Sequence, residues 1–260
     1  MKVVILCGGK GTRLREETEY RPKPMVPIGN RPILWHIMKT YAHYGHREFV
    51  LCLGYKGDMI REFFRNYLWN TCDITVSLGQ KSAPQFHDGH GEEDWKVTLA
   101  DTGENTMTAH RVKQIQRYIP QGEPFMLTYG DGLATIDLKA LVAAHQKAGK
   151  ICTLSAVHPA GRFGALRIEG DGRIQTFREK PQFEDAHVNG GYMVCEHRLF
   201  DFLPDDPAGM LEREPMEKLV RDGQLNAYQH EGFWQPMDTY QEMQHLNTLW
   251  AEGRAPWKVW

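Results

Sequence analysis

Hydrophobic positions in the first 150 residues follow two alternating patterns. Short continuous apolar runs rich in β-branched residues occupy positions 3–7, 49–53 and 125–129, and such runs are typical of strands buried on both faces. Between these runs, apolar residues recur at helical spacing. The first such segment contains Ile33, Leu34, Ile37, Met38 and Tyr41. Strands that alternate with amphipathic helices predict βαβ units and an open parallel sheet.

Other elements of this half follow from the same periodicity. They are a helix over 59–68, a strand over 74–78, a long polar loop over 80–95, a short strand over 97–99 and a helix that ends near Pro120. Asp137 is a predicted N-cap for a helix that runs to Gly149.

The second half of the chain has a different pattern, with more strands in succession. The predicted strands are 152–157, 165–168, 174–177 and 188–195, and three helices follow the last of them. Gly170-Asp171-Gly172 indicates a hairpin between the second and third strands. No linker, repeat or low-complexity tract separates the halves. We therefore expect one α/β domain over 1–260, with a Rossmann-like, mixed but mostly parallel central sheet flanked by helices, and a smaller β region added in the C-terminal half.

Composition narrows the classes of function. The chain is 41% hydrophobic and 25% charged, which is ordinary for a soluble enzyme, and its net charge of -2 provides no global basic field to collect nucleic acid. The five cysteines include no CxxC pair, which favours buried thiols in a reducing compartment over a zinc site. No stretch approaches the length of a membrane span, and the first apolar run is too short for a signal peptide. We expect a cytoplasmic protein with no membrane or nucleic-acid partner.

A glycine-rich loop follows the first strand directly. It reads Gly8-Gly9-Lys10-Gly11-Thr12-Arg13-Leu14, and glycines there let backbone N–H groups approach an anion closely. The loop lacks the third glycine of a dinucleotide-binding loop and the final Gly-Lys-Ser/Thr of a P-loop. On the glycines alone, a phosphate cradle and a plain strand-to-helix turn are equally good interpretations.

The next segment favours the phosphate cradle. Lys23 stands between Pro22 and Pro24, and proline fixes φ and stiffens its neighbours. A rigid backbone can aim one ammonium group at a phosphate. The alternative is a proline-rich connection with an incidental lysine.

Together, the Gly-Gly-x-Gly-Thr-Arg-Leu motif and the Arg-Pro-Lys-Pro motif at 21–24 resemble the signature of sugar-1-phosphate nucleotidylyltransferases, and the resemblance extends over essentially the whole chain. It implies the nucleotide-diphospho-sugar transferase type of fold, Mg²⁺ as cofactor, and a homo-oligomer, with a hexamer as one form. It also implies that residues 1–150 mainly bind nucleotide and 151–260 mainly bind sugar phosphate and contact other subunits. The nucleotide-binding residues that it implies are Leu6, Gly8, Gly9, Gly11, Thr12, Arg13, Lys23 and Gly130.

Two carboxylates are candidate metal ligands. Asp131 follows a predicted strand, where ligands of open α/β sheets bind, and a capped helix rather than a partner strand is expected after it. Asp238 precedes Thr239 and Glu242, which form a capping-box pattern, so Asp238 could also be a plain helix-start residue. The resemblance implies that both aspartates hold Mg²⁺.

The resemblance also assigns the two substrates. It places the sugar phosphate at Gly164, Glu179, Lys180 and Asn189. The segment from Asp101 to Arg111 resembles that of cytidylyltransferases acting on glucose 1-phosphate, with Thr106 and Arg111 at positions that contact CTP. Ala109 and His110 depart from the glycines usual there.

The predicted reaction needs no general base. A sugar phosphate is mostly dianionic at neutral pH and can attack the α-phosphorus of CTP in line, releasing pyrophosphate. Arg13, Lys23 and Lys180 are the predicted catalytic residues, through charge neutralisation and orientation. The alternatives are a uridylyl- or thymidylyltransferase, another sugar 1-phosphate, and a sensing subunit without catalysis. The tryptophans of the tail 256–260 are expected to be exposed and to contact another subunit.

Overall fold

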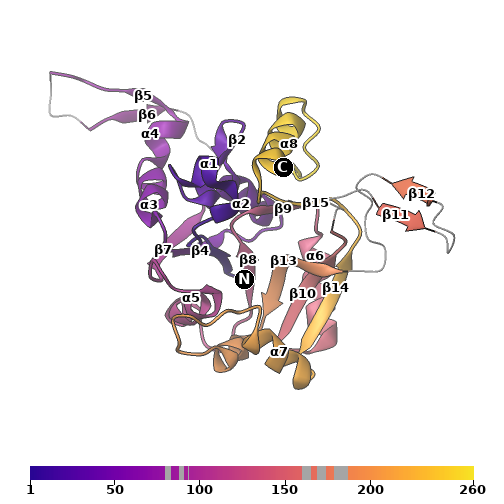
Figure 1. The fold of residues 1–260 in the computed structure, drawn as a ribbon. Helices are drawn as coiled ribbons and strands as arrows, with labels where there is room; N and C mark the ends of the chain where they lie inside the picture. Colours follow the sequence, from indigo (N-terminus) through magenta and orange to yellow (C-terminus); the bar gives the residue numbers. More distant parts are fainter. Residues whose placement is uncertain (80–82, 88–90, 93, 160–164, 169–173, 179–186) are drawn as a thin grey trace.

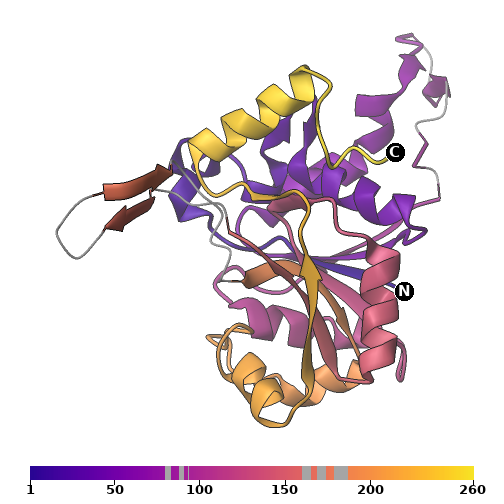
Figure 2. The same ribbon diagram turned by 90° about the vertical axis from the view of Figure 1, so that its right-hand side faces the viewer.

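The computed structural model describes residues 1–79, 83–87, 91–92, 94–159, 165–168, 174–178 and 187–260. A seven-stranded sheet forms its centre (Figures 1 and 2). In spatial order its strands are β14 (Leu225–His230), β10 (Cys152–Val157), β13 (Val188–Cys195), β8 (Phe125–Tyr129), β1 (Val3–Leu6), β4 (Glu48–Leu53) and β7 (Lys96–Asp101). Strands β8, β1, β4 and β7 run parallel to one another, and only β13 pairs antiparallel with its neighbours. The mixed, mostly parallel sheet is confirmed.

Helices cover both faces of this sheet, because alternate residues of each central strand point to opposite sides. One face packs against α2 (Ile33–His43), α6 (Leu138–Ala148) and α8 (Tyr240–Ala251). The other packs against α5 (Thr108–Gln114), the 3₁₀ helix η4 (His197–Phe202) and α7 (Glu214–Arg221). Asp137 caps α6 by accepting hydrogen bonds from the amides of Lys139 and Ala140, and Gly149 ends it at φ 59°, as predicted.

The remaining elements are short. The helical ones are η1 (Thr12–Leu14), α1 (Arg15–Thr18), η2 (Lys23–Met25), α3 (Gly57–Arg65), α4 (Tyr67–Thr71) and η3 (Gln116–Tyr118). The strands form four antiparallel pairs: β2 (Pro27–Ile28) with β3 (Arg31–Pro32), β5 (Asp73–Thr75) with β6 (Gln85–His87), β9 (Gly132–Ala134) with β15 (Trp234–Pro236), and β11 (Ala165–Ile168) with β12 (Ile174–Arg178). The hairpin predicted from Gly170-Asp171-Gly172 is confirmed by the β11–β12 pair, although these three residues lie outside the described part.

Several predicted boundaries are wrong. The helix expected over 59–68 is two helices, α3 and α4, with Asn66 between them. The strand expected over 74–78 is only β5, and the loop expected over 80–95 contains its partner β6. The two strands β14 and β15 were not predicted. Most of the β region expected as an addition joins the central sheet instead, because β10 pairs with both β13 and β14.

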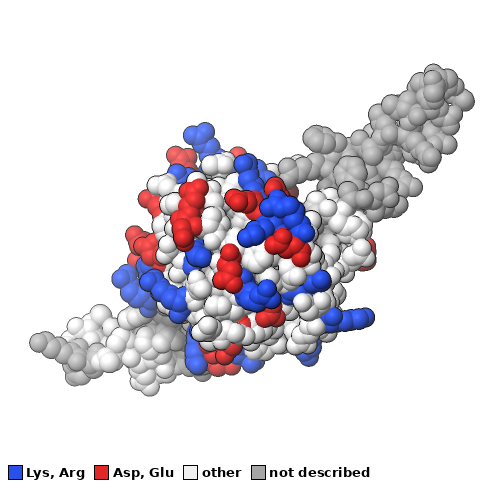
Figure 3. All heavy atoms as spheres, turned by 90° about the horizontal axis from the view of Figure 1, so that it is seen from below, with Lys and Arg blue, Asp and Glu red and all other residues white. Residues whose placement is uncertain are grey.

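The aromatic tail is not exposed as predicted. Trp257 is fully buried beside Phe233 and Trp250, and its indole N–H donates to Nδ1 of His36 at 3.4 Å. The tail therefore completes the core of its own chain. On the face in Figure 3, basic and acidic side chains are interspersed, so positive charge is not gathered there. Within the described part of the chain, no helix is both long enough and apolar enough to cross a membrane.

Candidate active site

A cavity of about 250 Å³ opens at the carboxyl ends of β1 and β8. This is where open α/β sheets bind ligands, because the loops after neighbouring parallel strands meet there. Its lining consists of Leu6, Cys7, Gly9, Gly11, Thr12, Arg13, Lys23, Pro24, Tyr129, Gly130 and Asp131. The structure thus brings together the glycine-rich loop, the proline-braced lysine and one predicted metal ligand.

The glycine-rich loop leaves β1 at Leu6 and turns through Gly11, whose φ of 61° is easiest for glycine. Among the described residues, the amides of Gly8, Gly9 and Gly11 donate no hydrogen bond. Gly9 and Gly11 line the cavity, and unpaired amides there can donate to an anion. Gly130 allows β8 to approach this loop, since a Cβ there would lie 2.9 Å from the Leu6 carbonyl oxygen.

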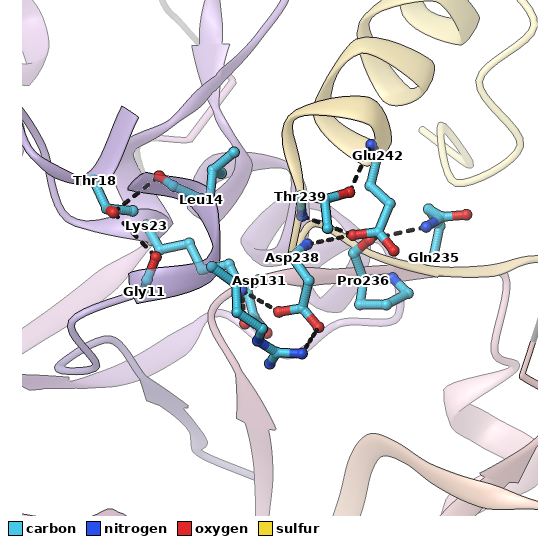
Figure 4. A network of polar contacts seen from close by, with 11 residues as sticks. Gly11, Leu14, Thr18, Lys23, Asp131, Gln235, Pro236, Asp238, Thr239 and Glu242 are labelled. Carbon is cyan, nitrogen blue, oxygen red and sulfur yellow. Dashed lines mark hydrogen bonds and ion pairs between the residues drawn. The ribbon is translucent and has the colours of Figure 1, made fainter. Parts of the chain in front are cut away.

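Lys23 lies at the centre of a charged network (Figure 4). Its ammonium group donates to Asp131 at 2.8 Å and to Asp238 at 2.5 Å, and the residue is 7% exposed. Burial alone would lower the pKa of Lys23, but the two carboxylates outweigh it, so the pKa is raised. Lys23 is therefore a buried cation that two acids keep charged.

The two acids come from distant parts of the chain. Asp131 follows β8, and Asp238 precedes α8, where Thr239 and Glu242 form the predicted capping box. Arg13 forms a second ion pair with Asp238 at 2.7 Å, although its own side chain is 64% exposed. Two carboxylates that already share one cation offer the hard oxygen donors that Mg²⁺ prefers, so the residues present fit the expected metal.

A second, smaller cavity shares Tyr129 and Asp131 with the first. Its lining consists of Thr128, Tyr129, Asp131, Gly132, Asn189, Gly190, Gly191, Tyr192, Trp234 and Pro236. Asn189 is held at this position because its side-chain oxygen accepts from the amide of Gly191 at 2.9 Å. Asp131 thus lines both the cavity beside the glycine-rich loop and the cavity beside the predicted sugar-binding residue Asn189.

Arg111 and Thr106 lie behind the glycine-rich loop and do not line either cavity. The buried guanidinium of Arg111 donates five hydrogen bonds to protein oxygens, among them the carbonyls of Gly8 at 3.1 Å and Leu53 at 3.1 Å. Burial lowers the pKa of Arg111. The hydroxyl of Thr106 donates to the carbonyl oxygen of Thr102 at 2.6 Å. Their predicted contacts with CTP therefore compete with bonds that both side chains already make.

Three predicted sugar-phosphate contacts, Gly164, Glu179 and Lys180, lie outside the described residues. Tyr129 and Trp234 line the cavities but were missed, although both stand inside motifs that drew attention to their aspartates.

The expectation that no partner strand follows Asp131 is wrong, because β9 begins at Gly132 and pairs with β15. That pairing carries the Met237 amide to the Asp131 carbonyl at 2.8 Å, which brings Asp238 to the cavity.

Residues 2–247 match the family model described as nucleotidyl transferase. The chain belongs to this family. A glucose-1-phosphate cytidylyltransferase of Salmonella typhi is 46% identical over 260 residues, which is the whole length of both chains. A UTP–glucose-1-phosphate uridylyltransferase of Synechocystis sp. is 28% identical over 86% of this chain and 56% of the relative.

Solved structures show the family fold. A UDP-glucose pyrophosphorylase complexed with UDP-glucose superposes with a TM-score of 0.70 at 17% identity, covering 97% of this chain and 99% of the other. HddC from Yersinia pseudotuberculosis superposes with a TM-score of 0.68 at 22% identity, covering 96% and 99%. At these identities the likeness concerns the fold alone.

Proposed function

We propose that this family member is a glucose-1-phosphate cytidylyltransferase, which transfers a cytidylyl group from CTP to α-D-glucose 1-phosphate and yields CDP-glucose and pyrophosphate. The full-length identity of 46% to the Salmonella typhi cytidylyltransferase carries the choice of substrates. The site supports the class of chemistry, because loop glycines, two cations and Asp131 line one cavity, and Asp238 forms ion pairs with both cations.

The reaction is an in-line displacement at phosphorus. An oxygen of the sugar phosphate forms a bond to the α-phosphorus of CTP, and the bond from that phosphorus to the bridging oxygen of pyrophosphate breaks. The attacking oxygen is mostly unprotonated at neutral pH, so no side chain has to remove a proton. The work of the protein is to orient the substrates and to offset their negative charge.

We assign the nucleotide phosphates to the first cavity. The amides of Gly8, Gly9 and Gly11 and the cations of Arg13 and Lys23 would bind the triphosphate and stabilise the leaving pyrophosphate. Lys23 carries the positive charge that this role requires, because its raised pKa keeps the buried ammonium group protonated at neutral pH.

Asp131 and Asp238 would hold Mg²⁺. The ion supplies positive charge to the phosphate oxygens when it is bound. Because Asp131 lines both cavities, it suits a residue placed where nucleotide and sugar phosphate meet.

We assign the sugar phosphate to the second cavity, with Asn189 at its wall. Gly164, Glu179 and Lys180 are proposed as further contacts, with Lys180 orienting the attacking oxygen. Thr106 and Arg111 are proposed to select the base. Because Arg111 binds the carbonyl of Gly8, it would also fix the shape of the loop that receives the phosphates. A cytoplasmic location and a homo-oligomer stay predictions.

The assay that tests this proposal measures pyrophosphate release from CTP, UTP, dTTP and ATP, each with glucose 1-phosphate, galactose 1-phosphate and mannose 1-phosphate, in the presence of Mg²⁺. We expect CTP with glucose 1-phosphate to give the highest kcat/KM. A higher kcat/KM with UTP or dTTP would contradict the assignment of CTP and make the preferred nucleotide the substrate. No release with any pair would favour a sensing subunit without catalysis.

A further inference from the structure

Three side chains that could ligate a metal meet at one edge of the central sheet, and none of them lines either cavity of the active site. His158 follows β10, His187 precedes β13, and Glu231 follows β14. These three strands are neighbours, with β10 in the middle. Val157 pairs with Val188 on one side and with His230 on the other, so the next step along both ladders sets His158 beside His187 and Glu231. The register of the sheet thus brings the three together.

The distances between these side chains suit a bound metal ion. One nitrogen or oxygen atom from each residue lies within 4.8 Å of the other two. Nε2 of His158 is 3.3 Å from Oε2 of Glu231, and the two imidazole rings are 4.2 Å apart between centroids. Metal–nitrogen bonds of 2.0–2.1 Å at tetrahedral angles put neighbouring ligand atoms about 3.3 Å apart. The His158–Glu231 pair already has this spacing, and His187 lies within reach of it by side-chain movement.

The donor set selects the kind of metal. Two imidazoles and one carboxylate suit Zn²⁺ and similar first-row transition ions, whereas Mg²⁺ prefers oxygen ligands alone. The His158 side chain is 13% exposed and the Glu231 side chain 71% exposed, so the cluster has a partly buried inner side and an open outer side. Three protein ligands with one open position are common for zinc.

We propose that His158, His187 and Glu231 form a binding site for one Zn²⁺ ion, separate from the Mg²⁺ site of the proposed reaction. The chain leaves the sheet at His158 and returns to it at His187, and the segment between them carries the β11–β12 ribbon, which projects from the body in Figures 1 and 2. The ion would join the two ends of this segment to each other and to the end of β14. This goes beyond the proposed function, because transfer of a nucleotidyl group requires no such ion.

The test is a titration of the full chain with ZnCl₂ in an isothermal titration calorimeter. The protein is first treated with EDTA and dialysed to remove bound metal. Excess Mg²⁺ is present throughout to occupy oxygen-only sites. The variants are His187→Gln and Glu231→Gln, since both residues are exposed and neither is a proposed substrate contact. His245→Gln on α8 is the matched control, because it removes another exposed histidine. Asp238→Asn shows whether Zn²⁺ binds in the active site instead.

We expect one equivalent of Zn²⁺ to bind to the wild type, to His245→Gln and to Asp238→Asn. Loss of a direct ligand should weaken binding by more than about 10-fold in His187→Gln and Glu231→Gln, since even the outer partners of ligands contribute that much. The melting temperature should rise with Zn²⁺ in the wild type and not in His187→Gln. The proposal is overturned by no binding, by equal binding in His187→Gln, or by binding that Asp238→Asn removes. None of these results bears on pyrophosphate release, so the proposed function is tested independently.

Discussion

Lys23 in the active-site cavity and His36 under the C-terminal tail are both buried basic groups, yet their surroundings favour opposite charge states. Lys23 contacts two carboxylates, which raise its pKa. His36 is surrounded by the rings of Trp35, Trp250 and Trp257, and burial lowers its pKa to about 4. Its Nε2 donates to the carbonyl oxygen of Ile28 at 3.0 Å while Nδ1 accepts from Trp257, which suits a neutral ring.

The difference shows how one chain separates chemistry from stability. In the cavity, charges offset one another and can be rearranged when an anionic ligand arrives. Under the tail, a neutral ring completes a dry aromatic cluster that contributes through packing. Substitutions in the first region should therefore change turnover more than stability, and substitutions in the second should do the reverse.

The largest expected effect concerns Lys23. Lys23→Ala removes the cation that both acids share, and we expect turnover of CTP and glucose 1-phosphate to fall by about a thousand-fold while the fold stays intact. Lys10→Ala is the matched control, because Lys10 is an exposed lysine of the glycine-rich loop. Pyrophosphate release and circular dichroism measure the two properties. Near-normal turnover in Lys23→Ala would contradict the catalytic role.

The next effect concerns Trp257. Trp257→Ala should lower the free energy of unfolding by about 3–5 kcal/mol, because it empties a fully buried site. Trp69→Ala, at a position 49% exposed, should cost less than about 1 kcal/mol. Urea denaturation gives both values. Equal losses would show that the tail does not stabilise the chain as the contacts indicate.

Stability should also depend on pH through His36. Because its folded pKa is about 4 and its ordinary value is 6.5, the unfolded chain binds a proton between these values that the folded chain does not. The free energy of unfolding should therefore decrease as pH falls from 6.5 to 4, by up to about 3 kcal/mol from this group. Urea unfolding at several pH values checks this. His36→Gln should show a shallower slope than the wild type, and an unchanged slope would rule out His36 as the cause.

The smallest effect separates two neighbouring glycines. A Cβ at Gly8 would lie 2.0 Å from Nη1 of Arg111, whereas a Cβ at Gly9 would meet nothing within 4 Å. Gly8→Ala should therefore cost about 1–3 kcal/mol of stability through overpacking, and Gly9→Ala should leave stability nearly unchanged. Thermal unfolding compares them. Equal stabilities would mean that Arg111 moves away easily and does not fix the loop.

The sequence predicted the features that depend on local pattern. The buried strands, the capped helix after Asp137 and the capping box after Asp238 each follow from residues close together in the chain. The Arg-Pro-Lys-Pro motif indicated Lys23, and the family resemblance implied both aspartates. What local pattern could not supply is the meeting of Lys23 with Asp238, which lie 215 positions apart and meet because β15 pairs with β9.

The failures have the same origin. Strand β14 was missed because its residues neither alternate clearly nor form an apolar run, and it is stabilised by its place beside β10. The tail tryptophans resembled an exposed contact surface because nothing nearby in the sequence reveals His36 as their partner. Two of the hydrogen bonds of Arg111 likewise reach Leu53 and Gly8, which are 58 and 103 positions away in the chain.

The central claim is that Asp131 and Asp238 jointly hold the metal beside the nucleotide, and the Mg²⁺ dependence of turnover in Asp238→Asn tests it most directly. Asparagine keeps the size of the side chain and removes its charge. We predict that turnover falls and that the Mg²⁺ concentration for half-maximal activity rises by about 10-fold or more. Unchanged turnover with an unchanged Mg²⁺ requirement would contradict the claim.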